Sequence, residues 1–294
     1  MERNVGTAKA FNLGVAAASS ELVSFLGDDT EVPPGWLKTL VEFLLRHPGT
    51  AACDAKYLNY FERDRIDASG GAGRMTDRFG NVVNRGGGER DDGRYDVPLK
   101  VSLAMALFDK EVLKEAGWFD EAFFAFYEET DLCWRIRRMG HEIWYVPQAV
   151  IFHIGSATTS YQGKGKMKTM REEFVFHFHK NRLRMILKNQ SGLDLVTALA
   201  VYSLDVAGLS VFWLAERNRN LPVLLRAIFW NFRNLRSTIQ ARKRVSATAR
   251  SGPFIPYIGF WRNWMGQAAH EGGILLKWLR LTAGRGNETV RNPT

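Results

Sequence analysis

Short apolar runs that stop at polar turns alternate with stretches of helical periodicity in the first 155 residues. Residues 22–26 are apolar and stop at an acidic turn at 27–29, as expected of a buried strand that reaches a loop. Residues 36–46 follow with apolar side chains at helical spacing. Further strand-like runs lie at 51–57, 101–108, 143–146 and 149–152. This alternation predicts an α/β fold.

Two further segments complete the pattern expected for the first 155 residues. Residues 62–96 are rich in Gly, Arg and Asp, and we expect a long loop, which in a compact domain is usually functional or mobile. A helix is expected over 130–139, with Thr130 as N-cap and Gly140 at its end. Two adjacent glutamates, at 128 and 129, then precede the helix.

Acidic residues and one histidine occur where strands end or a helix begins. Asp28 and Asp29 follow the first strand, and His153 follows the last one. Ligands of open α/β sheets bind beyond the carboxyl ends of strands, and such a donor set suits Mg²⁺ or Mn²⁺ held partly by phosphate oxygens. A carboxylate outside the metal site is a candidate general base. The alternatives are turn chemistry, a solvated helix start and a structural histidine.

Composition excludes some classes. With 46% hydrophobic and 24% charged residues the chain is not disordered throughout, and its two cysteines cannot form a disulfide framework or a Cys-rich zinc site. The net charge of +9 is uneven: residues 1–170 are slightly acidic, whereas 171–294 hold 19 basic and 7 acidic residues. The chain therefore reads as two pieces.

Five stretches of the first piece resemble the family 2 glycosyltransferases, which have the GT-A fold. The resemblance extends from residue 4 to about 189, and is greatest for the rhamnosyltransferase-like and galactofuranosyltransferase-like branch. The matching stretches are 4–14, 25–37, 117–121, 127–135 and 146–157.

The resemblance implies roles for individual residues. Asp29, with Asp28 beside it, matches the motif that binds the metal and the nucleotide diphosphate, and His153 matches the third metal ligand. Glu129 matches the catalytic base and Glu128 a residue that holds the acceptor hydroxyl. Acceptor binding falls on Trp118, Phe119 and Asp120. Asp131 and Arg135, four residues apart, would brace their helix.

The implied activity is an inverting, Mg²⁺- or Mn²⁺-dependent transfer from a nucleotide sugar to a glycan or lipid-linked glycan in cell-envelope polysaccharide synthesis. Two motif positions depart from the family: Gly27 replaces a carboxylate, and Glu129 stands where the family has Asp. The chain also begins at a stretch that in the family follows a first βαβ unit carrying the nucleotide-base pocket. We therefore expect an N-terminally truncated core over 1–190. The alternative is an inactive or split fragment that serves as a membrane-associated partner subunit, with a homo-oligomer or a complementing N-terminal chain as partner.

The second piece, residues 191–282, predicts basic amphipathic and apolar helices. Residues 193–215 could span a bilayer in length, but Asp205 lies at their centre, which favours a helix that lies on a membrane or packs within the protein. Trp residues interleaved with Lys and Arg favour attachment to an anionic membrane, on its cytoplasmic inner face, over a helical cap or dimer interface. A nucleic-acid enzyme is disfavoured because the basic residues lie apart from the acidic site. Residues 283–294 are expected to be a disordered tail.

Overall fold

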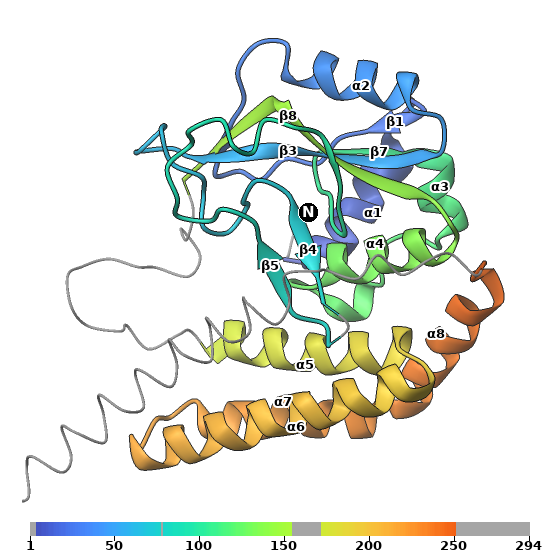
Figure 1. The fold of residues 1–294 in the computed structure, drawn as a ribbon. Helices are drawn as coiled ribbons and strands as arrows, with labels where there is room; N and C mark the ends of the chain where they lie inside the picture. The colour runs from blue at the N-terminus through green and yellow to red at the C-terminus, as the bar shows by residue number, and fades with distance from the viewer. Residues whose placement is uncertain (1–3, 78, 155–171, 251–294) are drawn as a thin grey trace, which may run out of the picture. The chain divides into compact units, whose positions relative to one another are not determined.

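A computed structural model describes residues 4–77, 79–154 and 172–250 (Figure 1). In chain order the elements are α1 (Thr7–Ala17), β1 (Leu22–Val23), β2 (Thr30–Glu31), α2 (Trp36–Arg46), β3 (Thr50–Asn59), β4 (Arg74–Thr76), β5 (Val82–Asn84), β6 (Leu99–Lys100), β7 (Leu107–Asp109), α3 (Lys110–Glu115), the 3₁₀ helix η1 (Glu121–Phe123), α4 (Glu128–Arg138), β8 (Glu142–His153), α5 (Glu172–Asn189), α6 (Gly192–Ala215), α7 (Leu221–Arg233) and α8 (Leu235–Thr248). The α/β class expected from the sequence is confirmed.

A mixed sheet forms the centre, with strand order β1-β7-β3-β8-β2 and β6 paired to β8. The long strands β3 and β8 run parallel, and every residue of β3 except the last is buried. A parallel pair covered on both faces needs such a run, because neither face meets water. The carboxyl ends of β3 and β8 therefore lie together, at Asn59 and His153.

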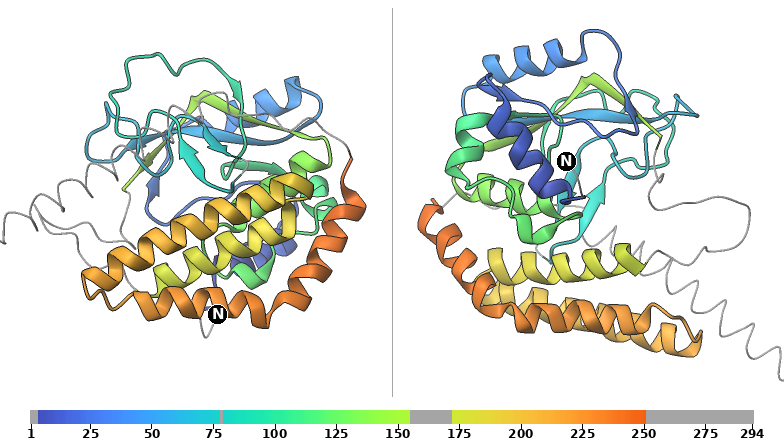
Figure 2. Two further views of the ribbon diagram at one scale, coloured as in Figure 1. Left: turned by 60° about the horizontal axis from the view of Figure 1, so that its bottom comes forward. Right: turned by 180° about the vertical axis from the view of Figure 1, so that it is seen from behind.

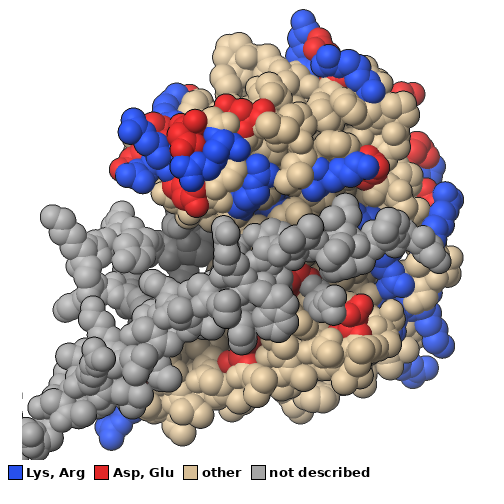
Figure 3. All heavy atoms as spheres, viewed as in Figure 1, with Lys and Arg blue, Asp and Glu red and all other residues tan. Residues whose placement is uncertain are grey.

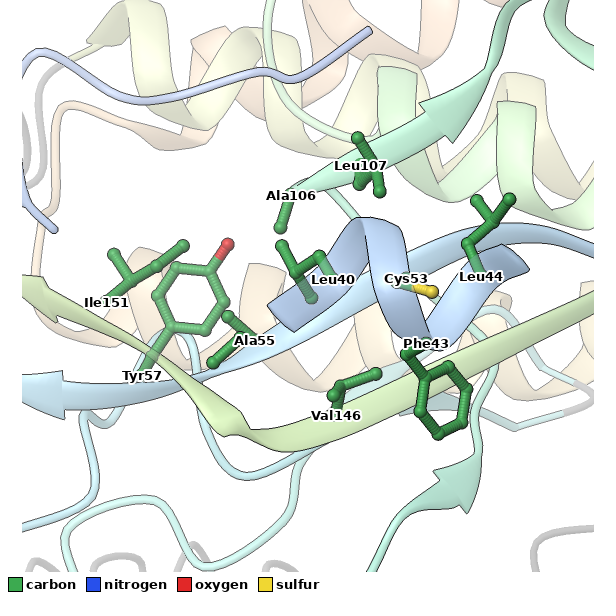
Figure 4. Close-up of a cluster of buried hydrophobic side chains, with 11 residues drawn as sticks. Leu40, Phe43, Leu44, Cys53, Ala55, Tyr57, Ala106, Leu107, Val146 and Ile151 are labelled. Carbon is green, nitrogen blue, oxygen red and sulfur yellow. The ribbon is translucent and has the colours of Figure 1, made fainter. Parts of the chain in front are cut away.

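Helix α2 covers one face of the sheet, and α1, α3 and α4 lie on the opposite side (Figures 1 and 2). Leu40, Phe43 and Leu44 of α2 pack on Cys53 and other side chains of the sheet (Figure 4). These three positions share one face of the helix at the 3.6-residue period, as the sequence pattern predicts. Helix α2 has the expected bounds.

Several local expectations need correction. The first strand is only Leu22–Val23. Residues 101–106 are largely buried and belong to no strand, although Leu103 forms an isolated antiparallel bridge with Arg74, and β7 starts only at Leu107. The two runs around Pro147 are one strand, β8, with an irregularity between the pairs Ala55–Val146 and Lys56–Val150 that accommodates the proline.

The segment 62–96 is not simply a long loop. It contains the hairpin β4–β5, and residues 70–77 are buried. Several of its polar residues have partners in the long strands: Arg74 Nε donates to Asp54 Oδ2 of β3 at 3.2 Å, and Asp91 accepts from Lys56 Nζ of β3 at 3.0 Å. The composition of the segment did not predict this packing, because charged side chains, and not apolar ones, bind the segment to the sheet.

Four helices follow β8. The helices predicted after residue 190 are present in the described part of the chain as α6, α7 and α8, and α7 ends at Arg233 just before α8 starts at Leu235. By length and composition, α6 could cross a membrane. Contacts group all these helices with the sheet in one unit over residues 1–254, and the boundary expected at 190 stays a prediction. The expected tail at 283–294 lies outside the described residues.

Helix α5 is fixed to α4 and η1 by buried charges. Lys188 Nζ lies 2.8 Å from Asp120 Oδ2 and 2.9 Å from Asp131 Oδ2. Asp131 also accepts hydrogen bonds from Arg135, which bonds the carbonyls of Ala116 and Trp118 as well. The expected bracing of α4 by Asp131 and Arg135 is confirmed, and it extends to α5.

Candidate active site

The pairing of β2 with β8 brings Asp29 to His153. Thr30 is opposite His153 in the antiparallel register, and the Ile154 N–H donates to the Asp29 carbonyl at 2.9 Å. The Asp29 carboxylate and the His153 imidazole consequently face each other, with 3.3 Å between Oδ2 and Nε2. These two predicted metal ligands thus lie together, as the sequence implied.

Asp67 holds the other side of the His153 ring. Its Oδ1 lies 3.0 Å from His153 Nδ1 and accepts hydrogen bonds from Ser69 N, Ser69 Oγ and Gly70 N. The hydrogen bond with Asp67 raises the pKa of His153 above its ordinary value, and Asp29 adds to the effect. A carboxylate that binds one imidazole nitrogen fixes the direction of the other, here toward Asp29.

Sequence reasoning missed Asp67. The available signal was Asp67 two residues before Ser69 and three before Gly70, the pattern of a turn in which an aspartate side chain accepts from the backbone that follows. Nothing in that pattern indicates His153, which is 86 residues further along the chain.

A pocket opens beside Asp29 and His153, and Arg74 lines it with them. The Arg74 side chain is 10% exposed, and its Nε donates to Asp54 Oδ2 at 3.2 Å. Its Nη1 lies 3.6 Å from Glu129 Oε1, while its Nη2 has no hydrogen-bond partner among the residues that the structure describes. Arg74 therefore connects the pocket to Glu129, and it was not anticipated from the sequence.

Glu128 and Glu129 belong to the first turn of α4, which starts at Glu128 with Tyr127 as N-cap. The expectation that Thr130 caps the helix was wrong, because the left-handed backbone of Tyr127 (φ 68°) already sets the turn. The helix dipole favours both carboxylates at this end.

The two glutamates differ in environment. Glu128 is buried, and its Oε2 has no hydrogen-bond partner in the described part of the chain. Burial and then the charge of Glu129 raise the pKa of Glu128 to about 8. Glu129 is partly exposed and lies beside the Arg74 guanidinium. At neutral pH Glu128 is therefore a neutral acid, while Glu129 is the more exposed member of the pair and lies beside a cation.

This difference predicts how stability depends on pH. The unfolded chain releases the Glu128 proton near pH 4.5, but the folded chain keeps it to about pH 8, so this group lowers stability as pH rises between those values. Glu128→Gln should raise the free energy of unfolding by about 2 kcal/mol at pH 8 and by less at pH 5. Urea unfolding at both pH values measures it. An equal change at both would contradict the assignment of a buried neutral acid.

The segment before Glu128 has an unusual backbone that α5 holds. Phe124, Phe126 and Tyr127 have φ values of 67°, 67° and 68°, a region that costs about 1–3 kcal/mol for such residues. The buried Asn181 Nδ2 of α5 donates to the carbonyls of Phe123 and Ala125 at 2.9 and 2.6 Å, and is 2.6 Å from that of Phe126. These bonds compensate the strain and fix the start of α4.

The expected acceptor residues are placed differently. Phe119 is buried among aromatic rings, with ring centroids 5.2 Å from Phe11 and 5.3 Å from Phe25, and so presents no face to a sugar. Asp120 is bound by Arg184 and Lys188; burial opposes its ionisation, but these cations hold the pKa of Asp120 well below its usual range. Both residues have structural partners, which corrects their assignment. Trp118 is half-buried and stays a candidate.

The two candidate metal ligands, Asp29 and His153, would suit a cation held mainly by its substrate. Within residues 4–77, 79–154 and 172–250 no three His, Cys, Asp or Glu side chains form a metal-binding group. Asp28 is exposed and does not line the pocket, so Asp29 and His153 are the available pair. Mg²⁺ and Mn²⁺ accept such a site when phosphate oxygens and water complete the shell.

Comparison with known proteins agrees with this geometry. Residues 1–116 match the model of the family described as "Glycosyl transferase family 2", a range that contains Asp29, Asp54, Asp67 and Arg74. Over these residues the chain is similar to the family 2 glycosyltransferases. This confirms the resemblance stated from the sequence.

Curated relatives of the glycosyltransferase domain are distant. The chain is 26% identical over 148 residues to "Pre-mycofactocin glycosyltransferase" of Mycobacterium tuberculosis. The aligned region covers 50% of this chain and 30% of that protein. The chain is 27% identical over 163 residues to "Uncharacterized protein y4gI" of Sinorhizobium fredii, covering 51% and 17%. The chain thus matches less than a third of the length of these relatives.

Two solved structures are similar to the chain at low scores. GalNAc-T7 with UDP, GalNAc and Mn²⁺ has a TM-score of 0.46 at 18% identity and covers 64% of this chain and 35% of its own. The mannosyltransferase PcManGT from Pyrobaculum calidifontis, with GDP-Man and Mn²⁺, has a TM-score of 0.38 at 15% identity and covers 83% and 65%. At these scores neither supports an argument about the present chain.

Proposed function

We propose that the chain transfers a sugar from a nucleotide-sugar donor to a hydroxyl group of a glycan or lipid-linked glycan, with inversion at the anomeric carbon. One observation carries the proposal: Arg74 contacts Glu129 and also lines the pocket that holds Asp29 and His153. A candidate base and a candidate diphosphate site are therefore neighbours. The family 2 match over residues 1–116 supports the same reaction class.

In the proposed reaction Glu129 accepts the proton of the acceptor hydroxyl as its oxygen bonds to the anomeric carbon. The bond between that carbon and the diphosphate oxygen breaks, and the nucleoside diphosphate leaves with the bonding electrons. Asp29 and His153 would hold Mg²⁺ or Mn²⁺, which supplies positive charge beside the leaving diphosphate. Arg74 holds Glu129 in place, and its guanidinium group adds positive charge at the pocket that Arg74 lines.

We further propose that the acceptor belongs to cell-envelope polysaccharide synthesis on the cytoplasmic side of the membrane. The support is the sequence resemblance to rhamnosyl- and galactofuranosyltransferases together with the apolar helices that follow the domain. A lipid-linked acceptor would be presented at that surface.

A donor screen tests the proposed function. The full chain is incubated with a panel of UDP, GDP and dTDP sugars and Mn²⁺, and release of nucleoside diphosphate is followed with and without EDTA. We expect turnover of at least one donor that stops with EDTA and falls in Asp29→Asn. Asp64→Asn, an exposed acid outside the pocket, serves as the control. Release unaffected by both EDTA and Asp29→Asn would reject the assigned site.

Asp67→Asn should weaken Mn²⁺ binding in the presence of nucleoside diphosphate by about 10- to 100-fold, because His153 loses the carboxylate that orients it. Titration calorimetry of the inactive Glu129→Gln background measures this without turnover. His153→Gln should weaken binding in that background as well, and the double variant His153→Gln/Asp67→Asn should be no weaker than His153→Gln alone. Additive losses would show that Asp67 acts on something other than His153.

A further inference from the structure

Helix α6 carries a stripe of exposed apolar side chains along its whole length. The stripe consists of Leu193, Val196, Leu204, Val211 and Leu214. Their spacings of 3, 8, 7 and 3 residues keep them on one side of a helix, and the stripe extends for about 32 Å at 1.5 Å per residue. Monomeric soluble proteins rarely leave so long an apolar surface uncovered.

A second stripe continues over α7 and the start of α8. Its members are Leu225, Phe229, Phe232, Leu235 and Ile239, with Phe229 and Phe232 64% and 67% exposed. Both α6 and α7 pack on the side of α5 away from the sheet (Figures 1 and 2). We call the two stripes together the apolar face; α5 covers neither of them.

The apolar face is accompanied by positive charge. Arg226, Arg233 and Arg236 are exposed and directly follow Leu225, Phe232 and Leu235 in sequence. Residues 221–248 contain six Arg and Lys and no Asp or Glu. In Figure 3 the lower edge of the molecule, where α6 and α7 lie, shows few charged atoms, and Lys and Arg gather at its right, at α8.

We propose that the apolar face lies on an anionic lipid surface, with its leucine and phenylalanine side chains at the acyl boundary and its arginines at the phosphate level. Arginine suits this position because its apolar stem lies along the hydrocarbon while the guanidinium reaches the head groups. A second copy of the chain fits less well, since a two-fold interface would place these arginines against their own equivalents without an acid between them.

Helix α6 lies along this surface and does not cross it. Asp205, at its middle, bonds Arg182 of α5 with 2.7 Å between Oδ2 and Nη2. Tyr202 and Trp213 are buried in clusters that contain α5 residues. A spanning α6 would lose these contacts and place an aspartate in the hydrocarbon, at roughly 3 kcal/mol.

Vesicle sedimentation of the full chain tests the proposal without any need for turnover. We expect binding to vesicles of phosphatidylcholine with phosphatidylglycerol, weaker binding to phosphatidylcholine alone, and a decrease with added salt. Phe229→Ser/Phe232→Ser should bind at least about tenfold more weakly. Leu45→Ser/Phe61→Ser, which alters two equally exposed side chains of the sheet part, should bind as the wild type does. Because all four side chains are exposed, both variants should keep the wild-type circular dichroism.

Three results would overturn the proposal. The first is a wild type that does not bind anionic vesicles. The second is a Phe229→Ser/Phe232→Ser variant that binds them as well as the wild type does. The third is a wild type that is dimeric in analytical ultracentrifugation and a Phe229→Ser/Phe232→Ser variant that is monomeric, with no vesicle binding by either. The last result would assign the apolar face to a second copy. None of these results bears on donor turnover, so the proposed sugar transfer stands or fails separately, whereas the membrane-side acceptor proposed above depends on the same surface.

Discussion

Glu129→Gln should lower kcat for sugar transfer by roughly 10²–10⁴-fold and change the donor KM little. Glutamine has nearly the same shape but cannot accept the proton of the acceptor hydroxyl. Glu129 is suited to that task because Arg74, whose Nη1 lies 3.6 Å from Glu129 Oε1, also lines the pocket with Asp29 and His153. Initial rates against donor concentration, at saturating acceptor, give both constants.

Two further variants make this result specific. Glu128→Gln should cost much less activity than Glu129→Gln at pH 7, because burial already keeps Glu128 neutral there. Glu111→Gln, an exposed acid in α3, should leave the rate unchanged. If Glu128→Gln caused the larger loss in kcat, the base would be Glu128 and the roles of the pair would be reversed.

Asp131→Asn should destabilise the protein by about 3–5 kcal/mol, which corresponds to roughly 10 °C in Tm. Asp131 is completely buried and neutralises Arg135 and Lys188, which would otherwise be buried cations with one remaining acid, Asp120. Thermal unfolding followed by circular dichroism measures the change.

The control is a helical pair with the same spacing on the surface. Lys38 and Glu42 are also four residues apart, 3.7 Å between charged atoms, but exposed. Glu42→Gln should change stability by less than about 0.5 kcal/mol. Lys188 and Arg135 lower the pKa of Asp131 against the effect of burial, so its contribution is fully present above its ordinary pKa of 3.8 and is lost as pH falls through the lowered pKa of the folded state. The difference between wild type and Asp131→Asn should therefore shrink as pH falls below 3.8. A difference that stays constant down to about pH 2 would contradict this origin.

Predictions from the sequence were most accurate for features that depend on neighbouring residues in the chain, such as the bounds of a helix or the polar turn that ends a strand. Apolar periodicity fixed the bounds of α2, and the acidic turn with the terminal histidine of β8 identified Asp29 and His153 as neighbours. The long-range partners could not be predicted. Arg74 and Asp67 lie in a segment whose composition indicates only a loop, and their contacts depend on how β3 and β8 align.

Acceptor residues were the weakest prediction, for a physical reason. An aromatic residue followed by an acid suits a sugar subsite, but the same pair suits a core ring followed by a helix cap. Phe119 packs against the rings of Phe11 and Phe25 in tilted and edge-to-face contacts, and Asp120 caps η1 by accepting from the Ala122 N–H. Only the packing of α1 and α5 distinguishes these possibilities.

The hydrogen bonds from Asn181 to the segment before Glu128 determine how the chain can be shortened for expression. A fragment that ends before α5 keeps the sheet, Asp29 and His153, yet it loses the amide that bonds the Phe123 and Ala125 carbonyls. The left-handed residues would then relax toward common backbone angles, and Glu129 would move with them. A shortened chain that is to keep Glu129 in place must therefore retain α5 through Asn189.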